Sequence, residues 1–238
     1  MTNERLSHHI SRQFTAELQE VRNRVLVMGG LVEQQIADAM RAVREGSVEL
    51  AEQVTSADYR VNAMEVAIDE ECSRILVRRQ PAATDLRMVI AVIKTIADLE
   101  RMGDEAARIA RMVSDLSLAQ SPRPRVMAGI QYLGEHVMHM CHDALDAFAR
   151  LDMEAAFEIV RRDRIADEQY EVLLRQLITF MMEDPRMISP ALGAVWSARA
   201  LERIGDHARN ICEYVIYLVG GKDVRHTNLE QMESEIRR

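Results

Sequence analysis

Two segments of the chain repeat each other closely: Leu99-Glu-Arg-Met-Gly-Asp-Glu-Ala-Ala-Arg-Ile109 and Leu201-Glu-Arg-Ile-Gly-Asp-His-Ala-Arg-Asn-Ile211. Eight of the fifteen positions that start at these two leucines are identical. Other residues recur at a similar separation, since Asp58 corresponds to Asp163. A block that returns at a nearly constant separation indicates a duplicated structural unit.

Composition and apolar spacing predict that each unit is helical. Only 4% of the 238 residues are aromatic, and there are 10 glycines and 5 prolines. Apolar residues recur at steps of three and four, which is the pattern of helices that pack in a bundle. Residues 8–45, 47–79 and the segment from Thr84 indicate the helices of the first unit, and Ser47 is suited to cap the second of them. The predicted fold class is all-α, with two tandem three-helix bundles built from six long helices.

The predicted domain boundaries follow from this duplication. Residues 1–120 form the first three-helix repeat and residues 125–221 the second, while residues 222–238 form a polar C-terminal tail that we expect to be loosely packed. Ser121-Pro-Arg-Pro124 is the clearest linker, because proline and serine interrupt helices.

Several classes of function are excluded by the composition. The formal charge of −8 and the lack of a basic stripe argue against binding of nucleic acid. The chain has no glycine-rich phosphate loop, no apolar run of about 18 residues that could span a membrane, and no apolar signal segment at its start, so we expect a cytoplasmic protein. Cys72, Cys141 and Cys212 are scattered among apolar residues, so we expect buried thiols in a reducing compartment.

The repeated blocks also predict a metal site in each unit. Each block carries Glu-x-x-x-Asp, which places two carboxylates on one face of a helix, and the preceding helix of each unit has an oxygen-bearing pair on the corresponding flank. If the acidic side chains of these two helices converge, the repulsion between their negative charges favours a multivalent cation between them. Oxygen ligands suit magnesium, manganese, calcium or iron better than structural zinc. The predicted metal ligands are Glu100, Asp104, Glu202, Asp206, Asp58, Asn62, Asp163 and Asp167.

Other interpretations of these residues stay open. The carboxylates could form a solvated acidic face relieved by neighbouring arginines, namely Arg101, Arg108, Arg203 and Arg209. His207 could add one nitrogen ligand beside Asp206. Gly103 and Gly205 face the core, and close helix approach is the favoured explanation for both.

A second candidate cluster contains three histidines, His136, His139 and His142, between Glu135 and Asp143. Soft metals could use such a set. The first repeat has no histidine at the corresponding positions, so ordinary surface or partly buried histidines are the preferred interpretation.

The sequence resembles the PhoU family of phosphate-transport accessory regulators over nearly its whole length. The resemblance rests on both Leu-Glu-Arg blocks and on three further segments, residues 8–14, 79–87 and 177–186. It implies a two-repeat helical bundle whose acidic motifs hold multinuclear clusters of iron or zinc. Glu100, Asp104, Glu202 and Asp206 match the family motif, whereas Asn62 departs from a strict carboxylate pattern.

The resemblance further implies a non-enzymatic negative regulator of the phosphate-starvation response that modulates phosphate uptake. Such a protein acts between the phosphate ABC transporter, through its ATPase PstB, and the sensor kinase PhoR. It forms a homodimer and meets the membrane only through these partners. A ferritin-like di-metal enzyme is disfavoured, because Gly103 and Gly205 stand where that class needs histidine. A metal-free helical scaffold is the remaining alternative.

Overall fold

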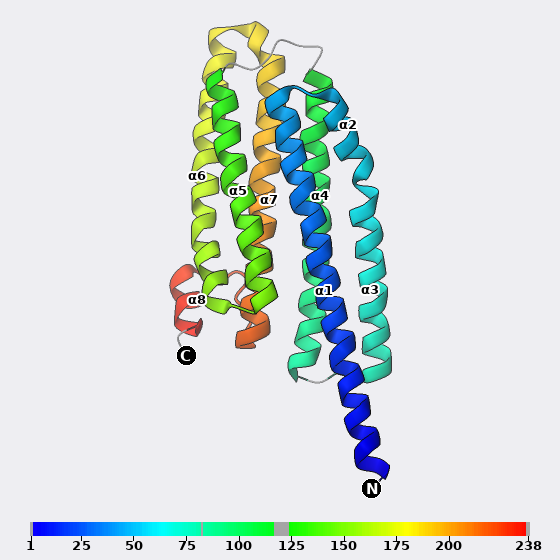
Figure 1. Cartoon of the computed structure of the whole chain (residues 1–238). Coiled ribbons are helices and arrows are strands. Elements are labelled where there is room, and N and C mark those ends of the chain that lie inside the picture. The colour runs from blue at the N-terminus through cyan, green and yellow to red at the C-terminus, as the bar shows by residue number, and fades with distance from the viewer. Residues whose placement is uncertain (1, 82, 117–123, 237–238) are drawn as a thin grey trace.

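The computed structural model describes residues 2–81, 83–116 and 124–236, and every element in these ranges is a helix (Figure 1). The first repeat contains α1 (Thr2–Glu45), α2 (Val48–Ala57), α3 (Tyr59–Arg79) and α4 (Ala83–Leu116). The second contains α5 (Pro124–Arg150), α6 (Met153–Glu183), the short 3₁₀ helix η1 (Pro185–Met187) and α7 (Ile188–Gly220), and α8 (Leu229–Ile236) follows. The predicted all-α duplicated bundle is confirmed.

Local sequence signals explain the start of α2 and the end of α7. The Ser47 hydroxyl accepts a hydrogen bond of 3.2 Å from the Leu50 amide, which confirms the predicted N-cap. Near the other end of the chain, α7 ends at Gly220 and is capped by Gly221, which has a φ of 74° and donates its amide hydrogen to the Tyr217 carbonyl. Glycine adopts this left-handed conformation without the steric penalty of a side chain.

The second predicted helix is interrupted, contrary to expectation. The helix over residues 47–79 is divided at Asp58 into α2 and α3. There the Val61 amide donates to the Asp58 carbonyl at 3.0 Å, a tighter i→i+3 turn than the α-helical ladder. The Asp58 side chain also accepts a hydrogen bond from Gln35 of α1, so the irregular turn coincides with a contact between helices.

The two bundles share one hydrophobic core. The helices α4 and α7 pack along each other, as do α1 and α5, and a single apolar cluster includes buried residues of both repeats. The contact between α1 and α5 is close, because a Cβ atom added at Gly134 would lie 2.3 Å from the Met40 side chain. The domain division between residues 120 and 125 stays a prediction, since residues 117–123, which hold most of the predicted linker Ser121–Pro124, lie outside the described residues.

The C-terminal tail is not loosely packed throughout, so that expectation was wrong. The helix α8 packs against α6 and α7, and its Met232 side chain is buried together with Val224 of the preceding segment. Burial of apolar side chains from a short amphipathic helix accounts for this docking. In the part of the chain that the structure describes, no helix combines the length and apolar character needed to cross a membrane.

Candidate functional site

In the first repeat, oxygen-bearing side chains gather where α3 begins beside α4. The Asp58 carboxylate accepts a hydrogen bond of 2.8 Å from the Gln35 amide. Burial raises the pKa of Glu100, and the charges of Asp104, Glu65 and Asp58 raise it further. These carboxylates therefore lie within electrostatic reach of one another, as the sequence predicted for this face.

One turn beyond Asp58, the side-chain oxygen of Asn62 is buried and has no hydrogen-bond partner among the described residues. A buried polar atom without a partner is unfavourable, so it marks a place where a ligand would be stabilised. Asn62 was the one predicted ligand that is not a carboxylate, and its oxygen remains a suitable hard donor for a cation.

In the second repeat, Asp163 and Glu202 lie deeper in the protein than their counterparts Asp58 and Glu100, while Asp167 is exposed. Asp163 of α6 is 4% exposed, and Glu202 of α7 is 9% exposed. Burial raises the pKa of each to about 6, and the charge of Asp206 adds to the effect at both. Burial likewise raises the pKa of Asp206 itself, with the charge of Asp167 as the next cause. The four predicted ligands of this repeat thus form one electrostatically coupled group.

Two arginines hold carboxylates of the second repeat. Arg199 forms an ion pair with one oxygen of Glu202, and Arg209 donates from Nη1 to Asp163 at 3.3 Å. The second oxygen of Glu202 is buried and lacks a hydrogen-bond partner in the described structure. Neighbouring arginines therefore relieve the negative charge at both carboxylates. The sequence predicted this role for Arg209, which pairs with Asp163, but not for Arg199, which pairs with Glu202.

These side chains do not form a preformed metal centre in this conformation. Within the described ranges, no group of three or more His, Cys, Asp or Glu residues is arranged to hold a metal ion. The donor set still fits a hard cation, because it consists of carboxylate and amide oxygens and contains the two unpartnered oxygens of Asn62 and Glu202. Metal ligation by the eight predicted residues stays a prediction.

The two repeated glycines have different surroundings. A Cβ atom at Gly103 would lie 3.1 Å from the Gln35 amide oxygen and 3.3 Å from a carboxylate oxygen of Asp58. At Gly205 the nearest atom would be 3.7 Å away, which is ordinary van der Waals contact. Close approach therefore explains the glycine of the first repeat and not that of the second.

His207 belongs to a buried polar cluster between the two bundles. Its Nδ1 lies 2.7 Å from Asp98 of α4, and the same carboxylate accepts hydrogen bonds from Asn210 and Tyr214. Asp98 is 1% exposed and was missed by the sequence analysis. The available signal was a single carboxylate between Ala97 and Leu99, next to an apolar seam.

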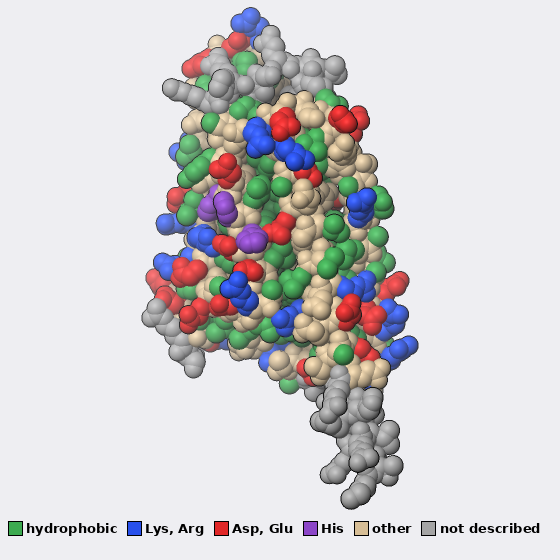
Figure 2. All heavy atoms as spheres, in the orientation of Figure 1, with side chains coloured by type: hydrophobic (Ala, Val, Ile, Leu, Met, Phe, Trp, Pro, Cys, Tyr) green, Lys and Arg blue, Asp and Glu red, His purple; other side chains and the backbone are tan. Residues whose placement is uncertain are grey.

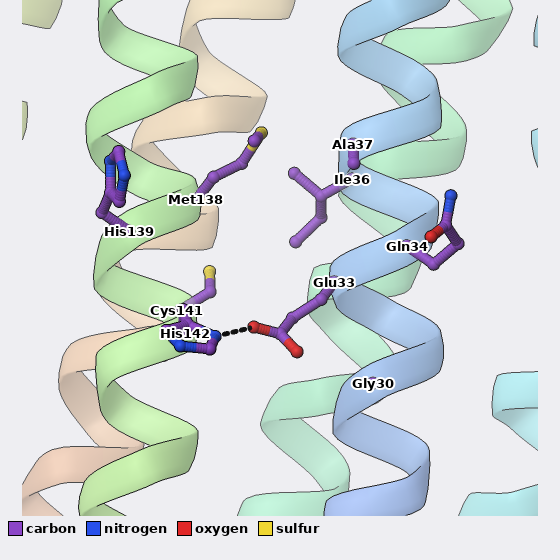
Figure 3. Close-up of a pocket in the computed structure, with 9 residues that line it drawn as sticks. All are labelled: Gly30, Glu33, Gln34, Ile36, Ala37, Met138, His139, Cys141 and His142. Atoms are coloured by element: carbon purple, nitrogen blue, oxygen red, sulfur yellow. Dashed lines mark hydrogen bonds and ion pairs between the residues drawn. The ribbon is translucent and has the colours of Figure 1, made fainter.

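The histidine cluster of α5 does not converge on one point. His142 contacts Glu33 of α1 at 2.9 Å, while His136 lies 3.3 Å from the Arg162 carbonyl. His139 lines an open groove of about 400 Å³ between α1 and α5, and Figure 3 shows its ring directed away from His142. This arrangement agrees with the preferred interpretation that these are ordinary histidines.

The face that carries this groove is mixed in character. Figure 2 shows acidic and basic side chains interspersed over it, with hydrophobic side chains along the seam between α1 and α5.

Buried free thiols are found at all three cysteines, as the sequence predicted.

Comparison with known proteins identifies the duplicated bundle. The family model described as the PhoU domain matches residues 25–113 and 130–215. The phosphate-specific transport system accessory protein PhoU homolog of Pseudomonas putida is 53% identical over 98% of this chain and 91% of its own length. PhoU of Escherichia coli strain K12 is 47% identical over 96% of this chain and 94% of its own length.

Solved structures agree with this result. The crystal structure of PhoU from Pseudomonas aeruginosa superposes with a TM-score of 0.85 at 50% identity and covers 88% of this chain and all of that chain. PhoU from Streptococcus pneumoniae, described as a phosphate transport system regulatory protein, has a TM-score of 0.82 at 32% identity over 89% of this chain and 99% of that chain. The chain therefore belongs to the PhoU family.

Proposed function

We propose that this protein is a non-enzymatic accessory regulator of phosphate transport that represses the phosphate-starvation response when phosphate is plentiful. It connects the phosphate ABC transporter, through the ATPase PstB, with the sensor kinase PhoR. Family membership supports the link to phosphate transport, because relatives of high identity are described as accessory proteins of the phosphate-specific transport system. We further propose that it acts in the cytoplasm as a homodimer.

The observation that carries a metal-dependent adaptor role is the duplicated carboxylate group. Each repeat holds acidic side chains within electrostatic reach of one another, at corresponding positions on corresponding helices. Bringing like charges together is unfavourable unless they are protonated or neutralised by a cation. Among the predicted ligands, one buried oxygen in each repeat, on Asn62 and on Glu202, has no hydrogen-bond partner in the described structure, which supports neutralisation by a bound ion.

The residues that would hold metal ions are the eight ligands predicted from the sequence. A bound cation of iron, zinc, magnesium or manganese would supply positive charge to a surface that is otherwise acidic. The protein would contribute the placement and the environment of the ligands. Its helices position the carboxylates, and burial of Asp163 and Glu202 limits their contact with water.

Phosphate itself would require such a cation at these faces. A carboxylate repels an anion, so direct binding of phosphate to the bare acidic group is unfavourable. We expect calorimetry to detect phosphate binding with the metal-loaded protein and to lose it after treatment with EDTA. Equal phosphate affinity in both samples would exclude a metal bridge.

The decisive experiment is capture of partners from cells grown at high and at low phosphate, with bound metal measured on the same sample. We expect PstB and PhoR to be recovered with wild-type protein and to be reduced for the double variant Glu100→Gln, Asp104→Asn. The matched control is Glu70→Gln, Asp146→Asn, which removes one exposed and one half-exposed carboxylate outside the proposed sites. Unchanged recovery by the site variant, together with absence of metal from the wild type, would contradict the metal-dependent adaptor.

A further inference from the structure

The two repeats differ in what neutralises their carboxylates. In the second repeat, the guanidinium groups of Arg199 and Arg209 contact Glu202 and Asp163. In the first repeat, no ion pair within the described side chains joins an arginine or lysine to Asp58, Glu100 or Asp104, and Asp58 is held instead by the neutral amide of Gln35. Arginines therefore form ion pairs with these acids in the second copy, whereas in the first copy Arg101 acts on Glu100 only through its charge, without an ion pair among the described side chains.

This difference is encoded at corresponding positions of the repeated blocks. In the alignment of Leu99 with Leu201, Arg199 corresponds to Ala97 and Arg209 to Ala107. Alanine has no charge to offer, so the first repeat cannot form either ion pair. Two residue differences therefore remove these ion pairs from the first repeat, where the helix is also interrupted at Asp58, whereas α6 continues through Asp163.

A guanidinium group competes with a metal ion for the same oxygens. It forms charge-assisted hydrogen bonds with a carboxylate, and its positive charge repels a cation brought to the same place. At Glu202, Arg199 takes one oxygen while the other oxygen is buried and unpartnered. One oxygen of Glu202 is therefore free to ligate a cation. The guanidinium group of Arg199 must move before both oxygens of the carboxylate can do so.

We propose that Arg199 and Arg209 are built-in competitors for the cation, so that the first repeat binds metal more tightly than the second. This inference rests on the metal site proposed above. Metal entry at the second repeat releases Arg199 and Arg209 from their carboxylates, whereas metal entry at the first repeat displaces only a neutral amide. Occupancy of the second repeat thus changes which charged groups its surface presents.

Affinity can be read separately at each repeat with Mn²⁺, whose free ion gives a paramagnetic resonance signal that disappears on binding. The double variant Glu100→Gln, Asp104→Asn leaves only the second repeat, and Glu202→Gln, Asp206→Asn leaves only the first. We expect the protein that retains the first repeat to bind Mn²⁺ at least about tenfold more tightly, from the strength of hydrogen bonds to charged groups.

The arginine is then tested in the protein that retains only the second repeat. Arg199→Ala, which installs the residue that the first repeat carries, is expected to tighten Mn²⁺ binding by about tenfold. The matched control is Arg175→Ala, which removes one positive charge from an exposed ion pair of α6 and is expected to leave the affinity unchanged. Arg209→Gln serves as the second variant, with a thermal melt to confirm folding, because Arg209 also pairs with buried Glu213.

These measurements distinguish failure of the proposed competition from failure of the proposed metal sites. Equal Mn²⁺ affinity at both repeats, with no effect of Arg199→Ala, would overturn the competition while leaving the metal sites in place. Absence of bound Mn²⁺ from every protein, including the wild type, would overturn the metal site itself and the competition with it.

Discussion

Asp98 of α4 lies against His207 of α7, with 2.7 Å between the carboxylate oxygen and the ring Nδ1. Both side chains are more than nine-tenths buried, at the contact between the two repeats. The second oxygen of Asp98 accepts a hydrogen bond of 2.7 Å from the Tyr214 hydroxyl. One carboxylate of the first repeat thus organises several polar groups of the second.

Removal of this carboxylate is expected to destabilise the protein. Asp98→Ala would leave the buried groups of His207 and Tyr214, and the half-buried amide of Asn210, without their acceptor, so the free energy of unfolding should fall by about 2–4 kcal/mol. Denaturation by urea measures the change. The control Asp146→Ala removes a half-exposed acid paired with Arg150 and should change stability by no more than about 0.5 kcal/mol. Equal effects of the two substitutions would show that the Asp98 cluster does not stabilise the interface.

The two repeated glycines provide a matched pair of variants. Gly205→Ala is expected to increase the free energy of unfolding by about 0.5–1 kcal/mol, because alanine favours a helix and the added methyl group meets only ordinary contacts. Gly103→Ala should gain less or lose stability, since its methyl group would press on Gln35 and Asp58. Thermal and urea unfolding of both variants test the difference. A larger gain at Gly103 than at Gly205 would contradict the packing described for the first repeat.

The metal-free protein should lose stability as the pH rises through the range in which Glu202 ionises. Burial raises the pKa of Glu202 to about 6 in the folded protein, so between about pH 4.5 and 6 the folded state binds more protons than the unfolded chain. Glu202→Gln, which resembles the protonated form, should therefore stabilise the metal-free protein at pH 7 by about 1 kcal/mol and have little effect at pH 4.

Urea denaturation in EDTA at both pH values measures this effect of Glu202→Gln. Its control is Glu158→Gln, which alters an exposed acid of α6 paired with Arg161 and should give no pH-dependent gain. If Glu202→Gln changed stability equally at pH 4 and pH 7, the carboxylate would not be held in an unfavourable charged form.

The contact between His142 and Glu33 predicts an altered titration on the α1–α5 face. The hydrogen bond to Glu33 and its negative charge raise the pKa of His142 above the usual value of 6.5. The small stabilisation from this pair is complete below the pKa of the unfolded chain and is lost as the pH rises through the folded pKa. Glu33→Gln should return the pKa of His142 toward 6.5.

Nuclear magnetic resonance of the imidazole protons follows this titration, with the His142 signal identified by its absence from His142→Asn. Asp38→Asn is the control, because Asp38 also lies on α1 but pairs with Arg41. If both substitutions changed the pKa of His142 equally, the shift would come from the combined negative charge on α1 and not from the contact with Glu33.

Helix boundaries and their caps were accessible to sequence analysis because their causes are local. Ser47 could be recognised as a cap since it precedes an apolar periodic segment and bonds a residue only three positions away. The interruption at Asp58 was not predicted, because it coincides with a hydrogen bond from Gln35, which lies on another helix. Likewise, α8 was missed because its packing depends on α6.

The candidate site was predictable in part for the same reason. Helical periodicity alone places Glu100 and Asp104, or Glu202 and Asp206, on one face, and the duplicated spacing doubles that evidence. Periodicity predicts the direction in which a side chain points around the helix axis. It does not predict how deeply that side chain is buried or which residues of other helices it contacts. The deeper burial of Glu202 and its ion pair with Arg199 therefore could not be derived from the spacing.

By itself, the sequence determined that this protein is a duplicated helical bundle of the PhoU family with matching acids in each copy, because repeats, caps and periodicity are properties of short segments. Only the tertiary structure decided how the copies meet. Asp98 and His207 are 109 residues apart in the chain, and their contact exists because α4 and α7 pack side by side. Contacts between distant segments depend on how whole helices pack, and that information is not contained in any local pattern.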